Sequence, residues 1–203
     1  HSGDERDYSI LPIDELMTSL SEKLNERFPG NIFAQGYADH SLATASWSFP
    51  AQRDELLETY DKALISHGQK HLASKFTPGV RFTTSDVGVA AASVSALLTG
   101  GQYPIRIGNV VSVHHRRQTK VRDFDSSLDM LFVQFADTIK KLESLLDLTL
   151  CYPVNAMTLA CKKLAMPKAA AMEAIEMFRM AVGETPASAH DVYMAMQLSL
   201  IHI

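Results

Sequence analysis

The chain has little cysteine and no long apolar run. Cys151 and Cys161 are its only cysteines, and their spacing fits no disulfide framework, zinc site or redox motif. No apolar stretch approaches the roughly 18–20 residues that a membrane-spanning helix needs, and no charged region followed by an apolar one opens the chain, as in a secretory signal. These absences predict a cytoplasmic protein with no membrane partner.

Catalytic and cofactor signatures are also missing. The chain contains no nucleophile triad pattern, no paired catalytic carboxylates, no dinucleotide fingerprint and no phosphate-binding loop. His67 and His71 stand four residues apart, but Gly68 lies between them and no carboxylate completes a metal set, which favours a surface or helix-end pair. We therefore expect no cofactor, no metal and no catalytic residues, although a site can still assemble in space.

Positive charge is concentrated in the middle of the chain. The net charge is −4 overall, but residues 64–122 contain eight Lys or Arg and a single acid, Asp86, which makes that segment +7. The segments on either side are acidic, at −7 for residues 1–63 and −4 for residues 123–203. The overall charge argues against a simple nucleic-acid coat, while the local charge permits a basic face.

The basic segment ends in four cations within nine residues, Arg116, Arg117, Lys120 and Arg122. Such a cluster can follow a phosphate backbone. The alternative is a solvated turn in which Lys120 and Arg122 pair with Asp123 and Asp125 at the start of the next helix.

A second polar group surrounds Asp86. Ser85 and Asp86 follow an expected strand, and with Asn109 and His114 they form a candidate polar pocket. The alternative is that Ser85 or Asp86 caps the next helix. His114 and His115 would point to opposite faces of a strand and could not chelate together.

Helical periodicity and strand-like alternation together predict an α+β fold, in which short antiparallel strands pack on a long amphipathic helix and the C-terminal third is helical. Helices are expected at residues 13–28, from Pro50 to Gly68, over 87–98, over 121–147, after Pro153 and Pro167, and over 182–197. Strands are expected within residues 31–49, 80–84 and 103–115. Turns are expected at Gly36, at 39–41, at 77–79 and at Gly108-Asn109.

The C-terminal region permits two further interpretations. Residues 155–178 have the outline of a helix-turn-helix, but an ordinary αα-hairpin fits better because the turn lacks its glycine and few side chains suit base reading.

We expect residues 1–182 to form a single α+β domain and 183–203 a C-terminal segment. Its last six residues, LSLIHI, resemble translated adapter sequence.

Three motifs carry a resemblance to a known family. Ser85-Asp86-Val87-Gly88, Ile105 to Asn109, and Val113-His114 before a long helix are similar to the uncharacterised phage/plasmid-like proteins with domain of unknown function 932. The resemblance covers roughly residues 80–145, and Gly108 stands where that family often has Cys. It implies a setting in phages, plasmids and integrative elements near replication and recombination functions, and no established activity.

These observations favour a non-catalytic mobile-element protein that binds DNA, or a replication or recombination protein, through its basic strand region. One alternative is a structural or host-interaction protein, such as a defence inhibitor, that binds other proteins through acidic surfaces. Another is an enzyme with Asp86 and His114 in one pocket.

Overall fold

The computed structural model describes residues 11–85, 90–100, 104–115 and 119–199. The chain divides into two compact units. Unit 1 comprises His1–Glu58, Phe76–Thr99 and Arg106–Thr138, and unit 2 comprises Thr59–Lys75, Gly100–Ile105 and Ile139–Ile203. Within the described ranges, no helix combines the length and the apolar character needed to cross a membrane.

Unit 1 is built on a five-stranded antiparallel sheet whose strands follow one another in chain order. The strands are β1 (Ile32–Ala38), β2 (Ala43–Ser48), β3 (Thr77–Thr84), β4 (Ala92–Thr99) and β5 (Ile105–Val113). Asp39 shapes the β1–β2 turn, because its Oδ1 accepts hydrogen bonds from the backbone N–H groups of Ser41 and Leu42. The bond from the Ser41 backbone is the largest reason that the pKa of Asp39 falls to about 2, followed by the bond from the Ser41 hydroxyl and the bond from the Leu42 backbone.

The register of the strands gives the sheet one apolar and one polar face. Directly opposite residues in neighbouring antiparallel strands lie on the same face. One row across β2, β3 and β4 is apolar and buried, and it consists of Ala45, Phe82 and Val94. The adjacent row lies on the opposite face and is polar; it runs from β1 to β4 and consists of Gln35, Ser46, Arg81 and Ser95.

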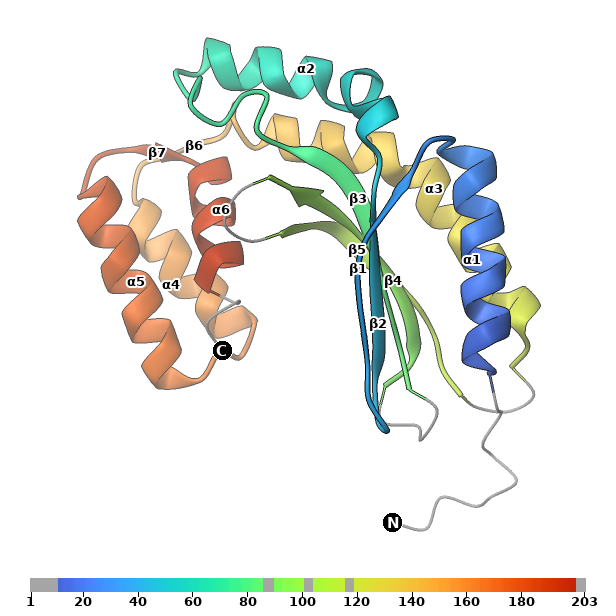
Figure 1. The fold of residues 1–203 in the computed structure, drawn as a ribbon. Coiled ribbons are helices and arrows are strands. Elements are labelled where there is room, and N and C mark those ends of the chain that lie inside the picture. The colour runs from blue at the N-terminus through green and yellow to red at the C-terminus, as the bar shows by residue number, and fades with distance from the viewer. Residues whose placement is uncertain (1–10, 86–89, 101–103, 116–118, 200–203) are drawn as a thin grey trace. The chain divides into compact units, whose positions relative to one another are not determined.

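Two amphipathic helices cover the apolar face: α1 (Ile13–Arg27) and α3 (Val121–Ser144), which lie side by side in Figure 1. The rings of Phe82 in β3 and Phe124 in α3 meet edge to face at 5.7 Å. Phe28 stacks on Phe49 at 4.1 Å and contacts Phe135 of α3 at 5.9 Å. Burying rings of this size supplies much of the apolar stabilisation of the unit.

Strand β5 approaches α3 closely at Gly108. The φ angle there is +65°, and a Cβ atom at this position would lie 2.7 Å from Cγ2 of Thr138. Only glycine adopts this conformation freely while leaving space for the threonine.

Unit 2 contains a three-helix bundle formed by α4 (Pro153–Lys163), α5 (Lys168–Val182) and α6 (Ala189–Ser199), with a short strand pair, β6 (Thr149–Leu150) and β7 (Ala187–Ser188). The bundle core contains Met157, Cys161, Ala174, Phe178, Val192 and Met196. Helix α2 (Arg53–Ser66), which follows a 3₁₀ turn at Pro50–Gln52, contributes residues to both units, as does α3.

The predicted α+β fold is confirmed, including the long amphipathic helix against the strands and the helical C-terminal third. Helix α3 begins at Val121 as expected and ends at Ser144, three residues before the predicted end. Pro153 and Lys168 begin α4 and α5, as the proline positions indicated. The final helix is shorter than predicted, and it includes Leu198 and Ser199 of the suspected adapter tail.

The helix predicted over residues 87–98 is wrong, because Ala92–Thr99 form strand β4. This strand lies between β3 and β5 and is buried over most of its length, so its side chains do not alternate between apolar and polar. A short apolar run of this kind does not distinguish a central strand from a buried helix.

Three predicted turns are also wrong. Thr77, Pro78 and Gly79 open strand β3 and pair with β4, and Gly36 lies within β1 opposite Ala45. Gly108 and Asn109 lie inside the continuous strand β5. None of these glycines marks a chain reversal. Gly108 has a positive φ angle, a Cβ atom on Gly79 would lie 2.3 Å from the Trp47 carbonyl oxygen, and a Cβ atom on Gly36 would lie 2.8 Å from Cζ of Phe33.

Candidate nucleic-acid interface

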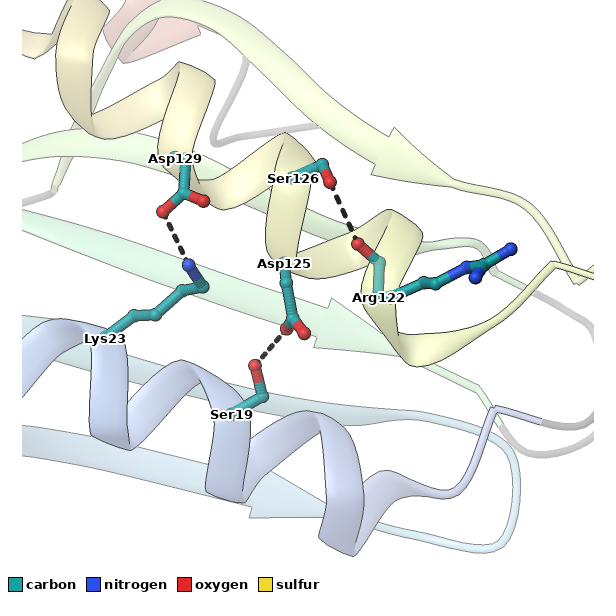
Figure 2. A network of polar contacts seen from close by, with 6 residues as sticks. All are labelled: Ser19, Lys23, Arg122, Asp125, Ser126 and Asp129. Carbon is teal, nitrogen blue, oxygen red and sulfur yellow. Dashed lines mark hydrogen bonds and ion pairs between the residues drawn. The ribbon is translucent and has the colours of Figure 1, made fainter.

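The basic cluster lies where β5 leads into α3. Lys120 and Arg122 are exposed, one immediately before the helix and one in its first turn. Arg116 and Arg117 lie outside the described residues. Figure 2 shows the Arg122 side chain extending away from Asp125 and Asp129, the acidic groups farther along α3.

The acidic groups at the start of α3 have other partners. Asp123 caps the helix, because its Oδ2 accepts a hydrogen bond of 2.8 Å from the backbone N–H of Lys120. Asp125 accepts a hydrogen bond from the Ser19 hydroxyl of α1, and Asp129 pairs with the Lys23 ammonium at 2.5 Å. In the part of the chain that the structure describes, neither Lys120 nor Arg122 pairs its side chain with an acid. The alternative of a self-neutralised turn therefore does not match the contacts.

The members of the candidate polar pocket differ in exposure. Ser85 is fully buried just after β3, whereas Asn109 in β5 and His114 just beyond it are exposed. Asp86 lies outside the described residues. His115 is buried and, like His114, lies beyond the end of β5 at Val113, so the two histidines are not on a strand. The described contacts link none of Ser85, Asn109 and His114 directly to one another.

The polar face of the sheet forms a site that was not predicted. A hollow of about 300 Å³ is lined by Gln35, Gly36, Tyr37, Thr44, Ser46 and Arg81. Arg81 is half-buried, and its Nε donates a hydrogen bond of 3.3 Å to the Ser46 hydroxyl. Burial lowers the pKa of Arg81, and the nearby positive charge of Arg106 in β5 lowers it further. Because the unperturbed pKa of arginine is so high, the group stays charged.

The sheet that carries this hollow has no negative charge. None of its five strands contains Asp, Glu or Lys, and their charged residues are Arg81 and Arg106. Alternation of Arg81 and Thr83 with apolar residues identified the β3 strand from sequence. The neighbours of Arg81 could not be identified in that way, because pairing with β1, β2 and β4 selects them.

Unit 2 offers weaker candidates. A second hollow of about 310 Å³ is lined by residues that include Cys151, Asn155, Arg179 and Glu184, but the Arg179 guanidinium already pairs with Glu176 at 2.7 Å. Helices α4 and α5 pack with α6 around a shared core, an arrangement that both an αα-hairpin and a three-helix DNA-binding motif adopt. Lys162, Lys163 and Lys168 are exposed near the turn between them.

The histidines form no metal site in the described ranges, where no group of three His, Cys, Asp or Glu residues could hold an ion. His67 is exposed beyond the end of α2 and its Nε2 lies 3.2 Å from Asp147. His190 is instead fully buried, and its Nε2 lies 2.6 Å from the Tyr60 hydroxyl. Burial, the larger cause, and the charge of His67 lower the pKa of His190 to about 4, against the opposing effect of Asp191.

Comparison with known protein families, with curated proteins and with solved structures finds no match to this chain.

Proposed function

We propose that this chain binds nucleic acid through unit 1, with the connection between β5 and α3 contacting the phosphate backbone. The observation that carries this proposal is that the Lys120 and Arg122 side chains pair with no acid among the described residues. Both are exposed, and the nearby aspartates bind the helix backbone and α1 instead of these two cations. Cations that remain unneutralised at a surface can replace the counterions of a phosphate backbone.

The composition of the sheet supports the same ligand. A phosphate chain that approaches unit 1 meets no carboxylate on the five strands and meets two arginines there. The predicted role is non-catalytic, because the sequence carries no catalytic signature, and it is independent of base sequence, because phosphate contacts fix position and orientation without selecting a sequence. We also propose a setting in replication or recombination, on the motif resemblance of residues 80–145 alone, since no family model matches the chain.

The test is a salt titration of oligonucleotide binding. Single- and double-stranded oligonucleotides are titrated with the wild type and with a variant in which Arg116, Arg117, Lys120 and Arg122 are all changed to Gln. We expect the variant to bind more weakly, and its slope of log K against log salt on duplex DNA to fall by up to about 0.9 for each lost phosphate contact.

A matched control separates a local site from a general charge effect. Changing Lys162, Lys163, Lys168 and Arg179 to Gln removes the same charge from the surface of α4 and α5. We expect this variant to bind as the wild type does. Equal weakening of both variants would argue against an interface at the β5–α3 connection, and absence of wild-type binding at low salt would exclude the nucleic-acid proposal.

A protein partner is the second candidate, and strand β1 favours it. This strand is at the edge of the sheet, contains no charged residue and no proline, and exposes Ile32, Phe33 and Tyr37 by more than half. An edge strand presents unpaired backbone groups that another strand can extend. This candidate replaces the first if no oligonucleotide binds and if a protein captured by the wild type is no longer captured by the Phe33→Lys variant. Met130→Lys, at a similarly exposed site on α3, is the control and should still capture that protein.

A further inference from the structure

The hollow around Arg81 has the composition of a small anion site rather than of an apolar pocket. Its lining combines one guanidinium, a carboxamide, hydroxyl groups and one aromatic ring. The strand register places Gln35 opposite Ser46, and Ser46 opposite Arg81, so these side chains share one face of the sheet. Thr83 and Ser93 extend the same polar face along the next row, beside Thr44.

Arg81 is held in a fixed position within this face. Its Nε donates to Ser46, which is itself buried, and this bond leaves the terminal N–H groups of the guanidinium to bind a ligand. No carboxylate pairs with Arg81 among the residues that the structure places. The planar guanidinium can donate two parallel hydrogen bonds to one phosphate group, a geometry that lysine cannot provide.

Tyr37 supplies a second kind of contact at the edge of the hollow. Its hydroxyl donates a hydrogen bond of 3.0 Å to Asp39, and its side chain is more than half exposed. That bond fixes the phenol and leaves the ring face open for stacking by a base. The Asp39 carboxylate also accepts hydrogen bonds from Ser41 and Leu42, so its charge is stabilised within the turn.

We propose that this hollow binds one nucleotide unit, with Arg81 as the phosphate ligand, Gln35 and Thr44 beside the sugar and Tyr37 beneath the base. The volume of about 300 Å³ is at the lower end of the range for ligand sites, which suits one phosphorylated sugar and not a large cofactor. The inference rests on the proposed function for the source of the nucleotide, which is a nucleic-acid strand that passes over the sheet. A free nucleotide presents the same chemical groups to the hollow.

The first measurement is calorimetric titration at low salt with a nucleoside 5′-monophosphate, the same nucleoside without phosphate, and inorganic phosphate. The wild type should bind the monophosphate more tightly than either fragment. Arg81→Gln should weaken monophosphate binding by about tenfold or more, since it removes charged hydrogen bonds. The affinity of Arg81→Lys for the monophosphate should fall between those of the wild type and Arg81→Gln, because lysine retains the charge but cannot donate two parallel hydrogen bonds. Arg179→Gln, which removes an arginine from unit 2, should have no effect.

A second set of variants covers the case in which Arg81→Gln does not fold, as judged by its thermal melt. Gln35→Ala and Tyr37→Ala change exposed side chains on the edge strand, and each should weaken monophosphate binding several-fold. Wild-type affinity in both variants would overturn the inference, as would equal affinity of the wild type for the nucleoside and its monophosphate.

The oligonucleotide arm separates this inference from the proposed function. If oligonucleotides bind and their affinity depends on Arg116, Arg117, Lys120 and Arg122 but not on Arg81, the proposed function holds and the hollow is not a nucleotide site. If the monophosphate binds through Arg81 while no oligonucleotide binds, the hollow is a site for free nucleotides and the proposed function is wrong.

Discussion

Acidification should destabilise unit 2 through His190, the second residue of α6. This histidine has no exposed surface, its Nε2 is bonded to Tyr60, and its Nδ1 has no hydrogen-bond partner in the part of the chain that the structure describes. Protonation would place a charge in this enclosed position beside His67, with Asp191 as the compensating acid. The Tyr60 hydroxyl cannot compensate by ionising, because burial and Asp61 raise its pKa.

The magnitude follows from the two pKa values of His190. The folded value is about 4 and the unfolded value is 6.5. Above pH 6.5 both states are neutral and the protein has its full stability. Between pH 6.5 and 4 the unfolded state takes up a proton that the folded state does not, so the free energy of unfolding falls as the pH falls. The total loss is roughly 3 kcal/mol, and it levels off below about pH 4.

The assay is urea unfolding, followed by circular dichroism, at intervals from pH 7.5 to pH 4. Other groups also titrate in this range, so the wild type is compared with His190→Asn, which removes the buried imidazole, and with His71→Gln, which removes an exposed one. We expect the pH dependence to become smaller in His190→Asn and to change little in His71→Gln. Parallel curves for the wild type and His190→Asn would refute the reasoning, as would an NMR titration of His190 centred near pH 6.5.

Two further substitutions test the packing of unit 1. Phe135→Ala should lower the free energy of unfolding by about 3–5 kcal/mol, because the ring is buried among Phe28 and Phe49; a thermal melt equal to that of Val133→Ala, at an exposed site on the same helix, would contradict this. Gly108→Ala should cost more than about 1 kcal/mol, because it combines a positive φ angle with the contact to Thr138. Thr138→Ala should reduce that cost in a double-mutant cycle, and strictly additive effects would show that the contact is not responsible.

Helices α1 and α3 could be located from the sequence because each carries its own apolar face. Leu131, Phe135 and Leu142 recur at helical spacing, and all three are buried in the structure. Strands β1 and β2 could be located because the polar group around Asp39 interrupts their alternation. The basic connection was also visible as a cluster, since its charges are close together in the chain.

The spatial neighbours of each charged group could not be predicted from the sequence pattern. The sequence placed Lys120 and Arg122 beside Asp123 and Asp125, which made self-neutralisation plausible. The structure instead pairs Asp125 with Ser19 and Asp129 with Lys23, residues of α1 that are more than a hundred positions away. Only helix packing could bring those groups together.

The sequence by itself therefore determined the elements whose side-chain pattern repeats within a single segment, together with the sign of the charge along the chain. The tertiary structure decided that residues 92–99 are a strand, because pairing on both sides buries them without alternation. It also decided the polar row from Gln35 through Ser46 and Arg81 to Ser95. Those residues come from four strands, and a shift of one position in any pairing would turn its side chain to the opposite face.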